Sequence, residues 1–150
     1  MMTNETNVDT AADTAAAIAP PVFDYAAWQA TFAMETAERN ARLIKKRRAL
    51  CTCLARAGAA NVTAEYSGCG DSGSTYSAEA FAADNTVVTL SAKLQHDVDE
   101  FIDDFISANA GGYENNDGGG GTVTITVATK EIEAEHYDNV VEQVHQTFSL

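Results

Sequence analysis

The sequence predicts an α+β fold, in which an antiparallel β-sheet carries a long N-terminal helix and a second helix packed on one face. Two observations lead to this prediction. Segments with helical spacing of apolar residues precede and separate segments whose apolar residues alternate, and the last two alternating segments are joined by a short turn. The length of 150 residues and the 45% hydrophobic content are typical of one globular domain.

We expect residues 1–21 to form a disordered tail and residues 22–150 to form the single domain. Large apolar residues are scarce before Pro20-Pro21, so this stretch can bury too little surface to offset its backbone entropy. It also lacks the basic start and continuous apolar core of a signal peptide. Because no apolar run reaches the roughly 18–20 residues that cross a bilayer, the sequence predicts a soluble cytoplasmic protein that does not contact membranes.

The first helix is expected from Tyr25 to Ala57, a stretch rich in the strong helix formers Ala, Glu, Arg, Lys and Leu. Asp24 is its predicted N-cap and Gly58 its end. A helix of this length spans about 50 Å, which is long for the domain, so we expect a break near Asn40.

A second helix is expected after Ser91, which can cap it, and Gly111-Gly112 should end it. Its apolar residues recur at helical spacing and mark the buried face: Leu94, Val98, Phe101, Ile102, Phe105 and Ile106.

Alternating apolar residues predict the strands, which are Asn61–Tyr66, Ser74–Phe81, Thr86–Leu90, Thr122–Val127 and Glu131–Tyr137. The last two form a hairpin around a turn at Thr129-Lys130. In its second arm His136 faces the core side, where a hydrogen-bonded core histidine is favoured over a catalytic base or ligand. The final segment, Asn139–Leu150, fits a helix or an edge strand, and both alternatives stay open.

The formal net charge of −13 is unevenly distributed along the chain. Seven of the nine basic residues lie in the first helix, between Arg39 and Arg56. From Gly58 onward only Lys93 and Lys130 are basic, against sixteen Asp and Glu residues. A chain this acidic repels nucleic acid at long range, so we expect no direct binding of nucleic acid and favour a basic protein partner or a metal ion.

Two loops rich in Gly and Asp, Ser67–Gly73 and Tyr113–Gly121, are the candidates for a ligand site. Hard oxygen ligands of the kind that calcium or magnesium prefers are supplied by Asp71, Glu114, Asn116 and Asp117. Their spacing matches no EF-hand loop, and Asn, Asp and Gly are also the residues that tight turns require. Turn chemistry is therefore the favoured interpretation, with a calcium or magnesium site as the alternative, and no other cofactor is expected.

The first loop includes Gly70-Asp71-Ser72-Gly73, a motif that surrounds the nucleophile of trypsin-like serine proteases. The chain is too short for two β-barrels, and no histidine or aspartate stands in a recognisable triad context, so a serine protease is disfavoured.

The three cysteines, Cys51, Cys53 and Cys69, match neither a zinc motif nor a disulfide framework, so reduced thiols are expected.

Residues 62–73, which end in Gly68-Cys69-Gly70-Asp71-Ser72-Gly73, and residues 112–118, which include Glu114-Asn115-Asn116-Asp117-Gly118, resemble an uncharacterised bacterial family that also occurs on mobile elements. The resemblance extends over roughly residues 23–150, although Tyr113 stands where the family usually has Trp. It implies a fold with a closing hairpin and implies that the two loops belong together. The family has no established activity.

The sequence therefore favours a small acidic, non-enzymatic binding or regulatory protein, encoded by a phage or plasmid, that acts on a basic protein partner. The predicted contact is the carboxylate row Glu131, Glu133 and Glu135, whose spacing of about 6.6–7 Å along a strand is close to a phosphate repeat and makes nucleic-acid mimicry an option. The alternative is a divalent-metal domain, including a hydrolytic one, built on the two loops. A further option is a homo-oligomer formed through the N-terminal helix.

Overall fold

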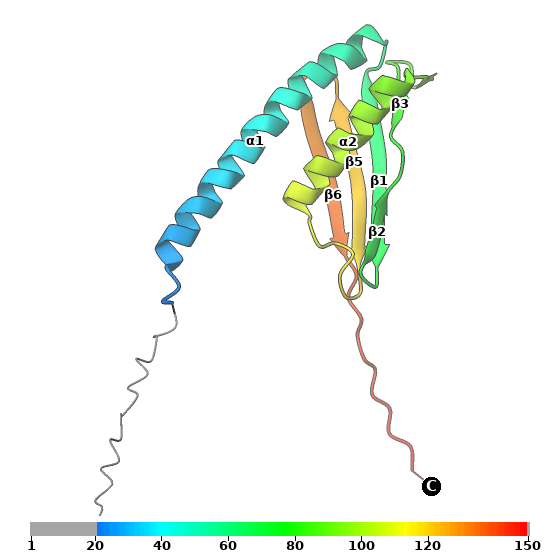
Figure 1. The fold of residues 1–150 in the computed structure, drawn as a ribbon. Coiled ribbons are helices and arrows are strands. Elements are labelled where there is room, and N and C mark those ends of the chain that lie inside the picture. Colours follow the sequence, from blue (N-terminus) through cyan, green and yellow to red (C-terminus); the bar gives the residue numbers. More distant parts are fainter. Residues whose placement is uncertain (1–20, 150) are drawn as a thin grey trace, which may run out of the picture.

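The computed structural model of the chain describes residues 21–149, so almost all of the expected disordered tail lies outside the described residues. The described part has two helices and a six-stranded antiparallel sheet, which confirms the predicted α+β fold. Figure 1 shows both helices on the same side of the sheet. Neither of them combines the length and the apolar character that a transmembrane helix requires.

Helix α1 (Tyr25–Arg56) is one unbroken helix of 32 residues, so the expected break near Asn40 is wrong. The helix contains no Pro or Gly that would interrupt it, and its strong helix formers continue through this region. Asp24 caps it as predicted, because its carboxylate accepts a hydrogen bond of 3.0 Å from a backbone N–H of the first turn. Gly58, with a φ of +87°, ends it.

Helix α2 (Ala92–Asn109) also begins and ends close to the predicted positions. The Ser91 hydroxyl accepts a hydrogen bond of 3.3 Å from the N–H of Leu94. Its buried side chains fall on the predicted face: Val98, Phe101, Ile102 and Ile106. They pack between the sheet and the C-terminal half of α1.

The strands are β1 (Asn61–Cys69), β2 (Ser72–Thr75), β3 (Glu79–Phe81), β4 (Val87–Val88), β5 (Gly119–Thr126) and β6 (Glu131–Asp138). They are arranged in the order β4-β3-β1-β5-β6, and β2 pairs with the C-terminal end of β1. The predicted hairpin is confirmed as β5 and β6, which pair along their whole length. The long strand β1 is the centre of the sheet, because β5 pairs along one side of it and β2 and β3 share the other.

Three expectations about the ends of strands are wrong. The expected loop Ser67–Gly73 is mostly strand, because β1 and β2 are joined by a two-residue turn at Gly70-Asp71. Gly119–Gly121, expected in the second loop, belong to β5. The expected strand Ser74–Phe81 is interrupted, so that β2 and β3 are separate short strands.

The C-terminal segment 139–149 has no regular secondary structure and extends away from the sheet (Figure 1). Neither the helix nor the edge strand considered for it is present in these described residues. Its apolar side chains are exposed: Val140, Val141, Val144 and Phe148.

The hydrophobic core lies between the sheet and the two helices. Among the largest side chains with almost no exposed surface are Leu54 of α1, Ile102 of α2, Val62 and Tyr66 of β1, and Val123 and Ile125 of β5. Within the described residues the core includes no buried charged side chain. The opposite face of the sheet is not covered by either helix, and this difference positions the candidate site.

Candidate functional site

The candidate site is the uncovered face of the sheet, here named the open face. Because strand side chains alternate, the residues between the buried positions of β1 and β5 point away from the helices. Most of these positions, and of their partners on β3 and β6, carry threonine and glutamate: Thr63, Glu65, Glu79, Thr122, Thr124, Thr126, Glu131, Glu133 and Glu135. By the same register, Asn61, Phe81 and Tyr137 also lie on this face. The sheet therefore has one apolar face and one largely polar face, and the charged side chains of its strands on the polar face are all acidic.

The strand register places the glutamates on both sides of a threonine stripe. Thr122 of β5 pairs with Glu65 of β1 and with Glu135 of β6. One step along, Thr124 pairs with Thr63 and with Glu133. Directly paired residues are about 4.5–5.5 Å apart at their Cβ atoms, so each of these rows is one continuous surface.

A further glutamate, Glu79 of β3, extends the second row, because it pairs with Thr63. On the other side, Glu131 pairs with Thr126. The predicted outward row Glu131, Glu133 and Glu135 is thus on the open face, and Glu65 and Glu79, which are far away in the sequence, join it there. No local sequence pattern indicates that these five glutamates share one face, because this depends on which strands are neighbours.

The glutamates of the open face have no counter-charge within residues 21–149. None of the five takes part in an ion pair or in a side-chain hydrogen bond there. Three acidic residues of α2 differ, since Asp104 pairs with Lys46 at 2.7 Å and Asp97 pairs with Lys93 at 2.6 Å. The third, Asp99, accepts the N–H of Ala78 at 2.8 Å. The open face therefore gathers five acidic side chains that the described part of the chain leaves unneutralised.

The two glycine- and aspartate-rich segments meet at one end of the sheet. The N–H of Asp71 donates to the carbonyl of Glu114 at 3.1 Å, and the N–H of Gly70 donates to the carbonyl of Asn116 at 3.4 Å. Both residues of the β1–β2 turn have positive φ, +60° for Gly70 and +65° for Asp71, as a type I′ turn requires. Turn geometry thus accounts for the Gly-Asp pair.

The four predicted metal ligands occupy two sides of this junction. Asp71 and Glu114 line one surface depression together with Ser72. Asn116 and Asp117 line another, beside Asp138 and Asn139. In the described range no three side chains among His, Cys, Asp and Glu are grouped as a metal ion would require, and the calcium or magnesium site stays a prediction.

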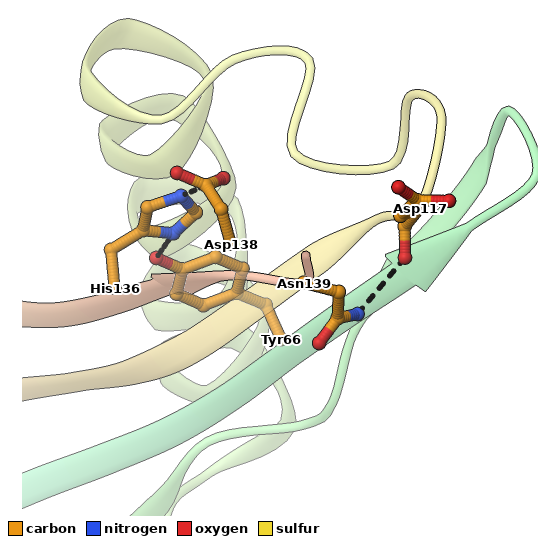
Figure 2. Close-up of polar contacts among 5 residues, drawn as sticks. All are labelled: Tyr66, Asp117, His136, Asp138 and Asn139. Atoms are coloured by element: carbon orange, nitrogen blue, oxygen red, sulfur yellow. Dashed lines mark hydrogen bonds and ion pairs between the residues drawn. The ribbon is translucent and has the colours of Figure 1, made fainter. Parts of the chain in front are cut away.

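A hydrogen-bonded chain of three side chains lies next to the junction (Figure 2). The Tyr66 hydroxyl shares a hydrogen bond of 2.8 Å with Nδ1 of His136, and Nε2 of His136 lies 3.2 Å from a carboxylate oxygen of Asp138. Tyr66 is on β1 and His136 is on β6, with Gly121 of β5 between them. The tyrosine ring crosses the glycine and stacks on the imidazole with ring centroids 5.9 Å apart.

The glycine at position 121 is required for this crossing. A Cβ there would lie 2.7 Å from the Tyr66 hydroxyl and would also collide with the carbonyl oxygen of Glu135. Burial raises the pKa of Tyr66, with Tyr113, packed edge-on against its ring, as a further cause. The hydroxyl is therefore held neutral inside the fold. His136 is hydrogen-bonded through both ring nitrogens, as favoured, but it is exposed, so the expected core position is wrong.

Asn139 fastens the end of β6 to the second loop. Its side-chain amide donates to the carbonyl of Asp117 at 3.0 Å, as Figure 2 shows, and its N–H donates to the carbonyl of Gly118 at 2.9 Å. Asp117 is therefore used through its backbone, which is a structural role. Taken together, the glycine-rich end is a corner of the fold held by backbone hydrogen bonds, and the open face gathers five unpaired glutamates on one surface.

Comparison with known proteins gives no further assignment: no family model, no curated protein and no solved structure matches the chain. The open face and its charges are therefore the basis for the functional proposal.

Proposed function

We propose that the chain is a non-enzymatic binding protein whose open face receives a basic surface of a protein partner. The observation that carries this proposal is the set of five glutamates on an uncovered sheet face, none of them neutralised within the described residues. The strand register pairs each of these glutamates with a threonine and none with a basic residue, so the sheet itself supplies no counter-charge. A basic partner would supply the missing counter-charges.

The rest of the chain supports a partner of this charge. The net charge is −13. Six of the nine basic residues lie in one ten-residue stretch of α1, residues 39–48, which is on the helix side of the sheet. Because α2 on that side carries five Asp and Glu residues, the helix side has charges of both signs, whereas the charged side chains of the open face are all acidic. Such a field steers a basic partner towards the open face and accelerates association, an effect that falls as salt is added.

The spacing of the carboxylates favours a nucleic-acid-binding groove as the basic surface. Glu131, Glu133 and Glu135 follow one another at about 6.6–7 Å along β6, a distance comparable with that between neighbouring phosphates of a nucleic-acid strand. The threonine hydroxyls beside them, from Thr122 to Thr126, add hydrogen-bonding groups next to the charges. The open face would then occupy a groove that otherwise holds phosphates.

The proposal is tested by measuring the binding of a fluorescent arginine- and lysine-rich peptide at increasing salt. Wild-type protein should bind the peptide, with affinity that falls steeply as salt rises. The triple variant Glu131→Gln, Glu133→Gln, Glu135→Gln should bind about tenfold more weakly, because each exposed pair contributes about 0.5 kcal/mol.

The matched control removes three charges elsewhere. Asp103→Asn, Asp117→Asn and Glu142→Gln change the net charge by the same amount at exposed sites that form no ion pair in the described structure. This control should bind within about twofold of wild type at equal salt. Equal losses in the two triple variants would show that total charge, and not the open face, governs binding, and would refute the proposal.

A further inference from the structure

The N-terminal half of α1 projects beyond the rest of the domain (Figure 1). Every residue from Tyr25 to Glu35 is exposed, whereas Leu50, Cys51 and Leu54 in the other half are buried against α2 and the sheet. Helices of this length that lack tertiary contacts are only marginally stable in water, because most helical stability in proteins comes from packing of an apolar face. Within residues 21–149, the projecting half is thus a helix without the packing that normally stabilises one.

Three aromatic residues, Tyr25, Trp28 and Phe32, form a continuous strip on this half, here named the aromatic stripe. The Tyr25 and Trp28 rings stack at 5.7 Å between centroids, and the Trp28 and Phe32 rings stack at 5.6 Å. They remain 59%, 48% and 56% exposed, respectively. Three large apolar rings on one uncovered helix face are typical of a protein contact surface.

The aromatic stripe continues the face by which α1 packs on its own domain. Tyr25 precedes Leu43 by eighteen residues, or five turns at 3.6 residues each, so both lie on the same side of the helix. Leu43 is partly buried against the core, and Leu50 and Leu54 follow it on that side. The same side of the helix therefore carries aromatic residues in its projecting half and leucines in its covered half, with Thr36 and Arg39 between them.

An apolar groove of about 240 Å³ begins where the covering ends, between α1, α2 and β6. Its apolar lining is Leu43, Ile44, Phe101, Phe105 and Ile132. Figure 1 shows α1 diverging from the sheet towards its N-terminus. Each chain thus has a projecting set of rings and a recess suited to receive rings, both on the same helix.

The geometry points to a second copy of this chain as the occupant of the groove. In the resulting two-fold dimer the α1 helices pack antiparallel, and Phe32 of the aromatic stripe of each copy enters the groove of the other. A two-fold contact requires a self-complementary surface, and rings and groove on one helix provide it. The contact would cover, in each copy, the aromatic rings that the single chain leaves exposed.

The order of charges along α1 favours the antiparallel arrangement. Glu35 and Glu38 come first, and Arg39 and Arg42 follow them. A two-fold axis between Glu38 and Arg39 places the acids of one copy opposite the bases of the other, whereas a parallel pair would align like charges.

The same axis brings Phe32 of the aromatic stripe to the groove. It sets Phe32 of each copy level with residues 44 and 45 of its partner, and Ile44 lines the groove. About 28 residues of α1 would then overlap, over about 42 Å.

The chain has a built-in probe for this contact, because Trp28 is its only tryptophan. The full-length protein is studied by sedimentation equilibrium and by tryptophan emission over the same dilution series. We expect a dimer at the higher concentrations, and on dilution we expect dissociation together with a red shift of the emission as Trp28 enters water.

Two single variants separate the stripe from the groove. Phe32→Glu changes the stripe and Ile44→Glu changes the groove, and each should weaken dimerisation about a hundredfold or more, because an unpaired charge is costly in an apolar contact. Both residues are exposed in the single chain, so the fold should be retained, which circular dichroism checks. The control is Val87→Glu, which should dimerise like wild type. Val87 is 71% exposed and lies on β4, at the opposite edge of the sheet from β6, which lines the groove.

Three results would overturn the proposal. The first is a wild-type monomer at every concentration, and the second is a Phe32→Glu variant that remains dimeric. The third is a monomer whose Trp28 emission is blue-shifted at all dilutions and shifts to the red when the segment after Asn139 is deleted. That result would show that the apolar C-terminal segment of the same chain covers the stripe.

Discussion

The two faces of the sheet differ in what they contribute to the molecule. On the helix-covered face, Val62, Val123 and Ile125 have no exposed surface and pack against both helices. On the open face, one residue away along the same strands, threonines and glutamates contact neither helix. The residues that stabilise the fold and the residues proposed to bind a partner are therefore neighbours on the same strands. Substitutions at neighbouring residues can test one face without disturbing the other.

The largest effect is expected where the covered face has no room for a side chain. Gly121→Ala places a Cβ against the Tyr66 hydroxyl and the Glu135 carbonyl, so the strands must separate or the ring must move. We expect a loss of about 3 kcal/mol or more in the free energy of unfolding, or failure to fold. Chemical denaturation measures this loss. Thr122→Ala, on the open face, should change stability by less than about 0.5 kcal/mol; similar losses in the two variants would contradict the assignment of faces.

Ile125 and Thr124 are neighbours on β5 that point to opposite faces of the sheet, so shortening each side chain compares the two faces. Ile125→Ala leaves a cavity in the core and should cost about 2–5 kcal/mol. Thr124→Ala removes a partly exposed side chain and should cost about 0.5 kcal/mol or less. Urea unfolding of both variants gives the comparison. A larger loss for Thr124→Ala would mean that the open face is covered in solution.

Much of the fold is predictable from the sequence, because the ends of the helices and the faces of the strands follow from local patterns. The alternation in Thr122–Val127 and the caps at Asp24 and Ser91 depend on nearest neighbours, and the structure has them as predicted. A break near Asn40 would be expected if a helix ended where its domain ends, but α1 continues beyond the domain.

Other features depend on distant contacts and are not predictable from local patterns. Glycine is a poor strand former, so Gly119–Gly121 are expected in a loop, yet the Tyr66 ring fills the space above Gly121. The outward row on β6 is predictable, whereas Glu65 and Glu79 join the site only through the strand order. The proximity of the two glycine- and aspartate-rich segments is implied by family resemblance and by no local pattern.

A smaller effect tests the turn that meets the second loop. Asp71 has a φ of +65°, so Asp71→Ala should cost about 1–2 kcal/mol, while Asp71→Gly should be close to wild type in stability. Thermal unfolding with and without calcium or magnesium measures both variants. A metal-dependent rise in the Tm of wild type that is absent in Asp71→Gly would instead establish the predicted metal site.

The smallest effect concerns the buried hydroxyl of Tyr66. Tyr66→Phe removes its hydrogen bond to His136 and should cost about 1 kcal/mol at neutral pH. Burial raises the pKa of Tyr66 above that of the unfolded chain, so its contribution is complete below pH about 10 and is lost as pH rises through the folded pKa. Stability should therefore fall more steeply above pH about 10 in wild type than in Tyr66→Phe. Parallel alkaline profiles would contradict the burial of this hydroxyl.

The central claim, that the open face is the binding surface, is tested most directly by NMR titration of the protein with the arginine- and lysine-rich peptide. We expect the largest amide shift changes on β5 and β6, at Thr122, Thr124 and Glu131–Glu135, and we expect them to disappear in the triple glutamine variant. Shift changes concentrated on α2 or on the segments around Asp71 and Asp117, with β6 unaffected, would contradict the claim.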